Sequence, residues 1–523
     1  MRLPGATAAG LLLTAAAPLT TGAVLEQEAA AARCAAFASA TFGEQVRLTA
    51  TRHVPAAASR QGPNAAAVTL PSHCLVSGVI GEREGAGGKK YGIGFELALP
   101  DRWSGRFLLQ GGGGLNGSVR PPTGPVAAGD RPALARGFAV VSHDSGHTGA
   151  VFDDSFLVDQ RAALDFAEAS VRTVTLLAKE MTRAYFDAPI ARSYMTGCST
   201  GGREGMLAAQ RYPELFDGII VGAPAMRTGN SNLAIEYASV QFNQAAPRDA
   251  EGLPLVERIF SPADRKTLLG GMLEQCDALD GLADGMIANV AGCRFEPRRL
   301  QCTAGKAENC LSPAQVGALE RAFAGPKDSA GYPLYAPVPY DTGIVETEGP
   351  IPGYLPTGRP GVFGPASRAL EIDLDSRANA LRNTAWQRLT DTNYWTNLNT
   401  FLGRGGKILF FHGVSDPWFS AFDTWDYWQR AAETNGAAWD NASRFYMNPG
   451  MPHCSGGNAH DQFDLLTPLV DWVEKAEAPG PPVSRRASDP QDQRPLCAYP
   501  SYPHYIGGKR TEATSFECRR SVQ

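Results

Sequence analysis

The segment Gly197-Cys198-Ser199-Thr200-Gly201 has the form Gly-x-Ser-x-Gly, and it decides the fold that we predict for this chain. The strand-prone run 192–196 leads into it and the helix-prone run 202–211 follows it. A serine on a sharp strand-to-helix turn is exposed as a nucleophile, and the flanking glycines remove Cβ clashes there. Because the bare motif also occurs by chance, this strand–turn–helix context gives the motif its weight.

The composition is that of an ordinary globular protein. Of its 523 residues, 43% are hydrophobic and 19% charged, and the net charge is −5. A chain of this length can bury the cores of two domains. It has no run of basic residues, so nothing in it indicates nucleic-acid binding.

The N-terminus resembles a secretory signal peptide over residues 1–23. Arg2 precedes an Ala/Leu-rich stretch, and Ala23 marks a plausible cleavage site, although the Ala-rich sequence continues to Ala32. A disordered Ala-rich tail is the alternative. Because the apolar run is too short to span a membrane, we expect a secreted or periplasmic protein without a membrane span.

The chain has ten cysteines, and none of their spacings is the Cys-x-x-Cys of a zinc ribbon. An exported protein resides in an oxidising compartment, so we expect its ten cysteines to form five disulfides. Three pairs follow from proximity and two remain, although the sequence alone does not prove the pairing: Cys276 with Cys293, Cys302 with Cys310, Cys497 with Cys518, Cys34 with Cys74, and Cys198 with Cys454.

Short β-prone runs alternate with helical stretches, which predicts an α/β fold with a mostly parallel sheet. A long helical stretch, 159–185, precedes the strand before the serine. The interval 225–400 breaks this rhythm with Pro/Gly-rich turns and four cysteines, and we interpret it as an inserted lid domain. We therefore predict an α/β-hydrolase fold whose catalytic domain comprises 24–224 and 401–523. The expected strands are 91–99, 106–110, 138–142, 192–196, 218–221, 407–411 and 444–448.

A serine nucleophile needs a base, and the base needs an orienting carboxylate. Asp416 follows the apolar run 408–411, and His453 follows another strand-prone run. The order Ser199, Asp416, His453 is that of α/β-hydrolases. Asp461 is a rival acid, but it lies too close to the histidine in sequence. The rival bases are His412, His143 and His147, and we expect His412 and His143 to be structural.

The pair Cys198–Cys454 would join the residue before the nucleophile to the residue after the base. Such a link would hold the two catalytic loops together, which is a form of preorganisation. Two ordinary buried cysteines are the alternative.

Acyl transfer also needs hydrogen-bond donors for the developing oxyanion. The amide of Thr200 is one candidate, and the glycine run 111–114 after a predicted strand can supply another. The run lacks the spacing of a phosphate-binding loop. A merely flexible loop is the alternative.

Three carboxylates separated by small residues occur within the segment 276–286. Such a segment can wrap a hard cation with oxygen ligands, although its spacing is not that of an EF-hand. A solvated acidic turn is the alternative to a Ca²⁺ site.

These residues resemble the tannase/feruloyl esterase family, whose signature is a Cys-Ser, an Asp and a His-Cys with the two cysteines bonded. The matching residues are Cys198-Ser199, Asp416 and His453-Cys454. The resemblance runs from about Cys34 to Cys518 and is closest to the mono(2-hydroxyethyl) terephthalate hydrolase branch, which shares all five cysteine pairs. It implies an α/β-hydrolase fold with a lid that carries one structural Ca²⁺.

The resemblance also assigns site residues. It implies an oxyanion hole made of the amides of Gly114 and Thr200. The implied Ca²⁺ ligands are Asp277, Asp280 and Asp284, with the backbone carbonyls of Leu282 and Met286.

The chain departs from the terephthalate branch in two places. The region 340–377 has no convincing match for the lid arginine that grips the substrate carboxylate, and Arg359 and Arg368 are only possible substitutes. Thr200 also replaces a Glu that is common in that branch. A general aromatic esterase therefore fits better than a terephthalate enzyme.

We thus expect a serine carboxylesterase that acts on small feruloyl- or galloyl-type esters. Trp418, Phe419 and Phe422 follow the acid and are candidates for the substrate pocket, with helix core as the alternative. A terephthalate monoester hydrolase is the alternative function. An inactive, calcium-stabilised binding protein and a peptidase or lipase are more remote, and the oligomeric state stays open.

Overall fold

The structure is a computed structural model that describes residues 21–60, 67–348, 351, 353–357 and 367–521. The predicted signal peptide, 1–23, therefore lies almost wholly outside the described residues. The first described element is helix α1 (Thr21–Phe37).

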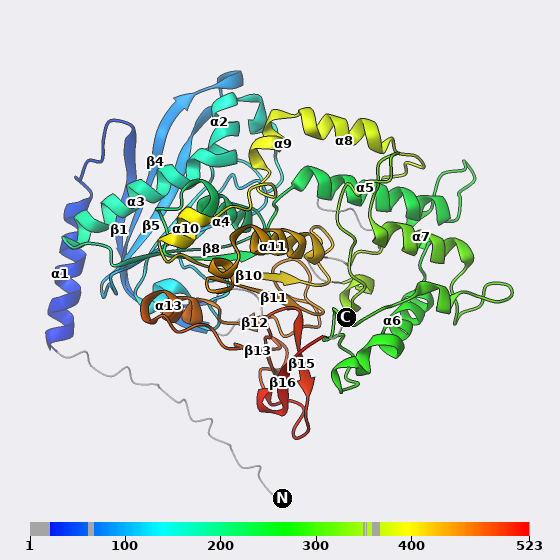
Figure 1. The fold of residues 1–523 in the computed structure, drawn as a ribbon. Coiled ribbons are helices and arrows are strands. Elements are labelled where there is room, and N and C mark those ends of the chain that lie inside the picture. The colour runs from blue at the N-terminus through cyan, green and yellow to red at the C-terminus, as the bar shows by residue number, and fades with distance from the viewer. Residues whose placement is uncertain (1–20, 61–66, 349–350, 352, 358–366, 522–523) are drawn as a thin grey trace, which may run out of the picture.

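A nine-stranded sheet forms the centre of the molecule (Figure 1). Its order is β1-β4-β5-β7-β6-β8-β9-β10-β11. The pairs from β1 to β7 are antiparallel, and the pairs from β7 to β11 are parallel. The strands are β1 (Val46–Val54), β4 (His73–Glu84), β5 (Lys90–Pro100), β6 (Arg106–Gln110), β7 (Ala139–His143), β8 (Arg192–Cys198), β9 (Gly218–Gly222), β10 (Lys407–Gly413) and β11 (Ser443–Asn448).

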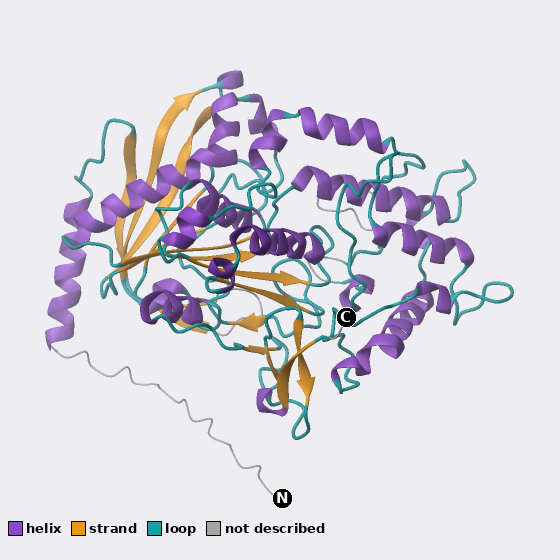
Figure 2. Ribbon diagram, in the orientation of Figure 1, coloured by secondary structure: helices purple, strands orange, loops and turns teal. Residues whose placement is uncertain are grey.

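Helices cover both faces of the sheet (Figure 2), as the apolar parallel strands require. In β9, Ile219 and Val221 enter one core, and Ile220 enters the core on the opposite face. The first core also takes side chains from α3, α4 and α11, and the second takes them from α13. These helices are α3 (Ser170–Phe186), α4 (Thr200–Arg211), α11 (Ala421–Asn435) and α13 (Leu466–Lys475). The predicted α/β class is confirmed.

All seven predicted strands are present, within one or two residues of the expected ends. The predicted helix 159–185 is interrupted: Asp159 caps the short α2 (Gln160–Leu164), a π-helical turn spans Asp165–Ala169, and α3 follows. The sequence analysis missed the antiparallel strands β1, at the edge of the sheet, and β4, which lies between β1 and β5.

The described part of 225–400 adds no strand to the sheet, and its regular elements are helices. Phe242, Leu268 and Leu319 belong to a separate core there. Figure 1 places α5 to α8, coloured green to yellow, beside the sheet. That this interval acts as a lid domain stays a prediction. Its helices are α5 (Thr228–Ala245), α6 (Pro262–Cys276), α7 (Pro313–Ala324), α8 (Leu374–Asn383), α9 (Ala385–Thr390) and α10 (Asn399–Gly403), the last of which extends beyond 400.

The remaining elements are short and lie outside the main sheet. Two of the small sheets, β12-β13-β14 and β15-β16, belong to the C-terminal part of the chain. No helix among the described residues is long and apolar enough to cross a membrane. These elements are α12 (Ala437–Asp440), β2 (Ala57–Arg60), β3 (Ala67–Leu70), β12 (Gln462–Phe463), β13 (Val483–Arg485), β14 (Gln493–Pro495), β15 (Ser501–Tyr505) and β16 (Phe516–Arg520).

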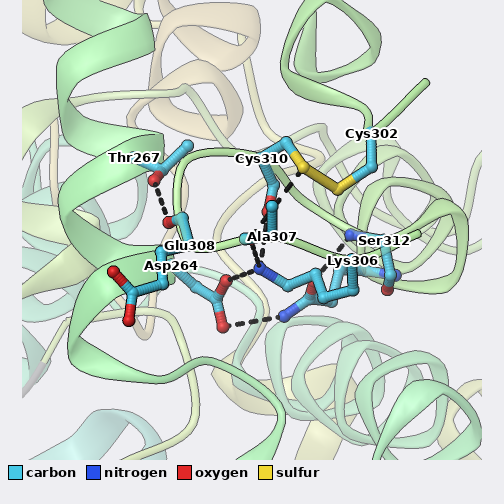
Figure 3. The surroundings of a disulfide bond; sticks show 9 residues. Asp264, Thr267, Cys302, Lys306, Ala307, Glu308, Cys310 and Ser312 are labelled. Atoms are coloured by element: carbon cyan, nitrogen blue, oxygen red, sulfur yellow. Dashed lines mark hydrogen bonds and ion pairs between the residues drawn. A yellow bond between two sulfur atoms is a disulfide. The ribbon is translucent and has the colours of Figure 1, made fainter. Parts of the chain in front are cut away.

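The five predicted disulfides are all present, so the pairing is confirmed. Figure 3 shows Cys302–Cys310, which closes a short loop against α6. Within that loop the Lys306 ammonium donates to Asp264 Oδ1 at 2.6 Å and to the Cys310 carbonyl at 2.5 Å. The loop is thus fixed to the helix by charge as well as by the covalent bond.

Candidate active site

Ser199 stands on a strained turn between β8 and α4. Its φ and ψ are 64° and −123°, which a residue with a side chain rarely adopts. Close backbone packing explains the neighbouring glycines, because a Cβ on Gly197 would lie 2.4 Å from the carbonyl of Gly201. The Ser199 amide donates to the Gly222 carbonyl at 3.0 Å. The turn therefore has the backbone of a nucleophile elbow.

The loops after β10 and β11 bring an acid and a histidine together. His453 Nδ1 lies 2.6 Å from Asp416 Oδ2, and both residues are buried. His453 Nε2 has no hydrogen-bond partner within the described chain. His453 and Ser199 line the same cavity, so this nitrogen is free to act on a group there.

Asp416 is held as a carboxylate. Its Oδ1 accepts from the amides of Trp418 at 2.9 Å and Phe419 at 3.1 Å. Burial alone would raise the pKa of Asp416, but the neighbouring His453 and His412 outweigh it and keep that pKa well below its usual range. An ionised acid can orient His453 and stabilise its protonated form.

The rival residues take other positions. His412 approaches Asp416 from a second side, with Nε2 3.3 Å from Oδ2, while its Nδ1 bonds the Thr424 hydroxyl. His147 stacks on Phe156, with ring centroids 3.7 Å apart. The other two rivals are also engaged elsewhere: His143 is buried against Glu204, and Asp461 accepts from the Gly456 amide.

The disulfide Cys198–Cys454 spans 256 residues of sequence and directly adjoins both Ser199 and His453. It ties the turn after β8 to the loop after β11. The predicted geometry of the link is therefore present, and its effect on activity stays a prediction.

The glycine run after β6 lies against the start of α4. The amides of Gly112 and Gly113 bond Glu204 and Asn116, each at 2.8 Å, whereas the Gly114 amide has no acceptor among the described residues. Thr200 is the first residue of α4, so its amide lacks an intrahelical acceptor. Both Gly114 and Thr200 line the cavity that contains Ser199. Their amides are thus available to a developing oxyanion.

A cavity of about 790 Å³ opens over Ser199. Trp418 and Phe419 line it, and the centroids of their rings lie 4.8 and 5.4 Å from that of the His453 ring. Phe422 does not line it: α11 begins at Ala421, and Phe422 packs against the main core instead. The sequence analysis missed Trp386 of α9, which lines the cavity from the interval 225–400, called the helical insertion below. No local motif marks that tryptophan.

Of the two arginines proposed to grip a substrate carboxylate, only Arg368 belongs to the described residues, and it does not line the cavity. Arg368 faces Asp249 at 3.8 Å and is half-exposed, away from the cavity, and Arg359 lies outside the described residues. Arg60 and Arg120 line the cavity instead, and no salt bridge to either is present among the described residues. The Arg120 guanidinium lies beside the glycine run, 2.7 Å from where a Cβ of Gly113 would be.

The acidic segment forms a tight loop after α6. Asp277 accepts from the amides of Asp284 at 3.1 Å and Gly285 at 3.0 Å, and Asp280 accepts from Leu282 at 2.9 Å. Burial, together with the neighbouring carboxylates, raises the pKa of Asp280 to about 7. No group of three or more His, Cys, Asp or Glu in the described chain has the geometry of a metal site as it stands.

The sequence profile of the family described as "Tannase and feruloyl esterase" matches residues 77–519. The chain belongs to the tannase and feruloyl esterase family. Like other proteins of the family with esterase or hydrolase names, it is a carboxylic ester hydrolase.

Similar proteins of this family include a mono(2-hydroxyethyl) terephthalate hydrolase of Piscinibacter sakaiensis, which is 36% identical over 91% of this chain and 90% of its own length. A probable feruloyl esterase of Arthroderma benhamiae is 30% identical over 81% of this chain and 82% of its own. The crystal structure of an esterase from Aspergillus oryzae has a TM-score of 0.75 and 25% identity, and covers 94% of this chain and 100% of its own. Feruloyl esterase B from the same organism has a TM-score of 0.74, 24% identity and the same coverage. The predicted α/β-hydrolase fold is confirmed.

Proposed function

We propose that this family member is a serine carboxylesterase that hydrolyses small aromatic esters of the feruloyl or galloyl type. The observation that carries the proposal is the His453–Asp416 contact of 2.6 Å, with His453 Nε2 unpartnered in the described part of the chain and beside the cavity that Ser199 lines. Feruloyl esterases among the similar proteins support the substrate class. The aromatic walls Trp386, Trp418 and Phe419 fit a planar ring.

The chemistry proceeds in two acyl transfers. Ser199 Oγ attacks the ester carbonyl while His453 Nε2 takes its proton, and the amides of Gly114 and Thr200 bind the oxyanion. The C–O bond to the alcohol breaks as His453 returns the proton to the leaving oxygen. Water then attacks the acyl-enzyme with the same proton transfers, which releases the acid and restores Ser199.

Hydrolysis of a small ester panel tests this proposal. The purified, oxidised protein is assayed with methyl ferulate, methyl gallate, mono(2-hydroxyethyl) terephthalate and a short p-nitrophenyl ester, each beside Ser199→Ala. We expect Ser199-dependent turnover with the highest kcat/KM on ferulate or gallate. Turnover that survives in Ser199→Ala, or none in the parent protein, would overturn the proposal.

A terephthalate monoester is the second candidate substrate. Arg120 favours it, because its guanidinium lines the cavity without an acidic partner in the described chain and could pair with a free carboxylate. The 36% identical relative carries that activity in its name. If this candidate is right, Arg120→Gln raises KM for the monoester and leaves KM for methyl ferulate unchanged.

We also propose one structural Ca²⁺ at the loop of Asp277, Asp280 and Asp284, with the carbonyls of Leu282 and Met286. Carboxylate and carbonyl oxygens are the donors that Ca²⁺ prefers. Asp284 Oδ1 is buried and has no hydrogen-bond partner among the described residues, which supports a role as a cation ligand, whereas Arg494 donates to Asp284 Oδ2 at 2.8 Å and supplies part of the balancing charge. The ion would stabilise the loop and take no part in the acyl transfers.

We further propose that the enzyme acts outside the cytoplasm. Five disulfides support an oxidising compartment. N-terminal sequencing of protein recovered from culture medium or periplasm tests this, with a start near residue 24 expected and recovery only from the reduced cytoplasm contradicting it.

A further inference from the structure

The glycine run beside Ser199 has three fixed amides and one free amide. Gly111 donates to the Thr196 carbonyl at 2.9 Å, Gly112 to Glu204 Oε2 at 2.8 Å, and Gly113 to Asn116 Oδ1 at 2.8 Å. The Gly114 amide alone has no acceptor in the described chain. The direction of this free amide therefore depends on how firmly the three preceding residues are held.

Glu204 holds the run from the helix that begins at the nucleophile. It lies on α4, one turn after Thr200, and is 1% exposed. Two further bonds join the same helix to the run: the Gly201 amide donates to the Gly112 carbonyl at 3.1 Å, and the Thr200 hydroxyl donates to the Gly114 carbonyl. Gly112 is thus bonded to α4 through both its amide and its carbonyl.

Close backbone packing against α4 fixes the position of the glycine run. A Cβ on Gly111 would lie 2.6 Å from Gly201 Cα and 3.2 Å from Glu204 Oε2. The run and the helix therefore touch through their backbones. A shift of the Glu204 carboxylate would be transmitted directly to the run.

The Glu204 carboxylate is buried, and no cation among the described residues forms a hydrogen bond with it. Arg203 is next to it in sequence, but its guanidinium donates to the carbonyls of Ala167 and Phe166 at 2.8 and 3.0 Å. The nearest donors are the Gly112 amide and the Ser145 hydroxyl, the latter at 3.4 Å from Oε1. Because burial of a carboxylate is costly, a purely structural position would be better filled by an apolar side chain.

A histidine completes the surroundings of the carboxylate. The Ser145 amide donates to His143 Nδ1 at 3.2 Å, which leaves the ring proton of a neutral His143 on Nε2. That nitrogen lies 3.9 Å from Glu204 Oε2. His143, one of the rival bases, therefore lies beside Glu204. No contact among the described residues joins His143 to the reacting atoms.

We propose that Glu204 is a positioning residue for the oxyanion hole: its carboxylate fixes Gly112 and thereby aims the Gly114 amide at the substrate carbonyl oxygen. This inference rests on the proposed acyl transfer at Ser199. Removing one oxyanion donor from a serine hydrolase costs about 10²–10³ in kcat. A donor that is displaced and not removed should cost less, about 10- to 100-fold.

Two variants of Glu204 and a control variant elsewhere on α4 test the proposal. Glu204→Met keeps the length and removes the strong acceptor, so we expect kcat to fall about 10- to 100-fold while KM changes less than about threefold. Glu204→Gln restores an acceptor oxygen to Gly112 and should recover most of that loss. Gln210→Met is the matched control: Gln210 is also buried on α4, but it bonds the segment 392–395 and not the glycine run. The control should lose thermal stability without this loss of kcat.

The outcomes separate this inference from the proposed function. No Ser199-dependent hydrolysis in the parent would refute the function itself. An active parent with Glu204→Met at the parental kcat, equal losses in the Met and Gln variants, or a loss confined to KM would refute only the role of Glu204. If Glu204→Met does not fold, Glu204→Asp is the deciding variant, because it keeps the charge but moves the carboxylate away from the Gly112 amide. A lower kcat at unchanged KM then supports the role of Glu204, and a parental kcat refutes it.

Discussion

Gly450 donates its amide hydrogen to Asp341 Oδ2 at 2.7 Å, although 109 residues separate the two in sequence. The same carboxylate oxygen accepts from the Ser415 hydroxyl at 2.5 Å, and Asp341 is completely buried. Ser415 precedes Asp416, and Gly450 lies shortly before His453. One side chain of the helical insertion thus joins the loop of the acid to the loop of the histidine.

Asp341→Ala should therefore impair both stability and activity. Loss of the acceptor leaves the buried Ser415 hydroxyl and the buried Gly450 amide without a hydrogen-bond partner. Each unpaired group lowers the free energy of unfolding by about 1–3 kcal/mol. We expect kcat to fall about tenfold or more, because small misplacements of catalytic groups are costly. Urea unfolding and steady-state kinetics measure the two effects. Asp341→Asn is the control and should retain part of both, and a parental kcat in a destabilised Asp341→Ala would argue against a role in aligning the loops.

Opening Cys198–Cys454 should lower activity selectively. In Cys198→Ser/Cys454→Ser the two catalytic loops lose their covalent link, and we expect kcat to fall about tenfold or more at little change in KM. Cys302→Ser/Cys310→Ser is the matched control, since that disulfide lies in the helical insertion away from Ser199. An equal fall in both double variants would show that the link next to the nucleophile has no special role.

Removing one acidic ligand should abolish the effect of calcium on stability. Asp280→Ala should lower the Tm measured in Ca²⁺ and make the Tm insensitive to chelator. Asp489→Ala is the matched control, because Asp489 accepts from the amide two residues on, as Asp280 does, but in an exposed turn. Absence of calcium in elemental analysis of the purified protein would refute the site.

Acid should destabilise the enzyme through His147. Burial lowers the pKa of His147 from 6.5 to about 4, so between these values the unfolded chain binds a proton that the folded chain does not. The free energy of unfolding should therefore fall as pH drops from 6.5 towards 4, and be independent of this group above 6.5. His147→Asn should flatten the dependence seen in urea unfolding across that window. An unchanged slope would mean that another group dominates; burial lowers the pKa of His73 and His143 in the same direction.

The sequence predicted those parts of the fold and site that depend on local patterns. The apolar runs marked the six strands that have a parallel partner, because such strands are buried on both faces, and the Gly-x-Ser-x-Gly context placed Ser199 on its turn. The seventh predicted strand, β5, is antiparallel to both neighbours. The edge strand β1 and its neighbour β4 were missed, because strands with partly exposed residues show weaker apolar runs than strands buried throughout. The helix 159–185 was predicted as one element because nothing in its apolar pattern marks the π-helical turn that interrupts it.

The missed site residues are those brought together only by tertiary structure. Glu204 lies in a helix, where glutamate is a common residue and gives no signal of a special role. Its proposed role depends on contact with the glycine run 92 residues earlier. Asp341 and Trp386 come from the helical insertion, whose approach to the cavity no sequence spacing specifies. Phe422 was placed in the pocket by its proximity to Asp416, but the start of α11 turns its side chain towards the core.

Trapping the acyl-enzyme tests the central claim most directly. The protein is mixed with a short p-nitrophenyl ester, quenched in acid within the first turnover, digested and analysed by mass spectrometry. We predict that the peptide containing Ser199 gains the mass of the acyl group, and that Ser199→Ala shows no acylated peptide. Acylation of another residue in the parent, or hydrolysis without any acylated Ser199 while p-nitrophenol is released in a burst, would contradict the assignment of Ser199 as the nucleophile.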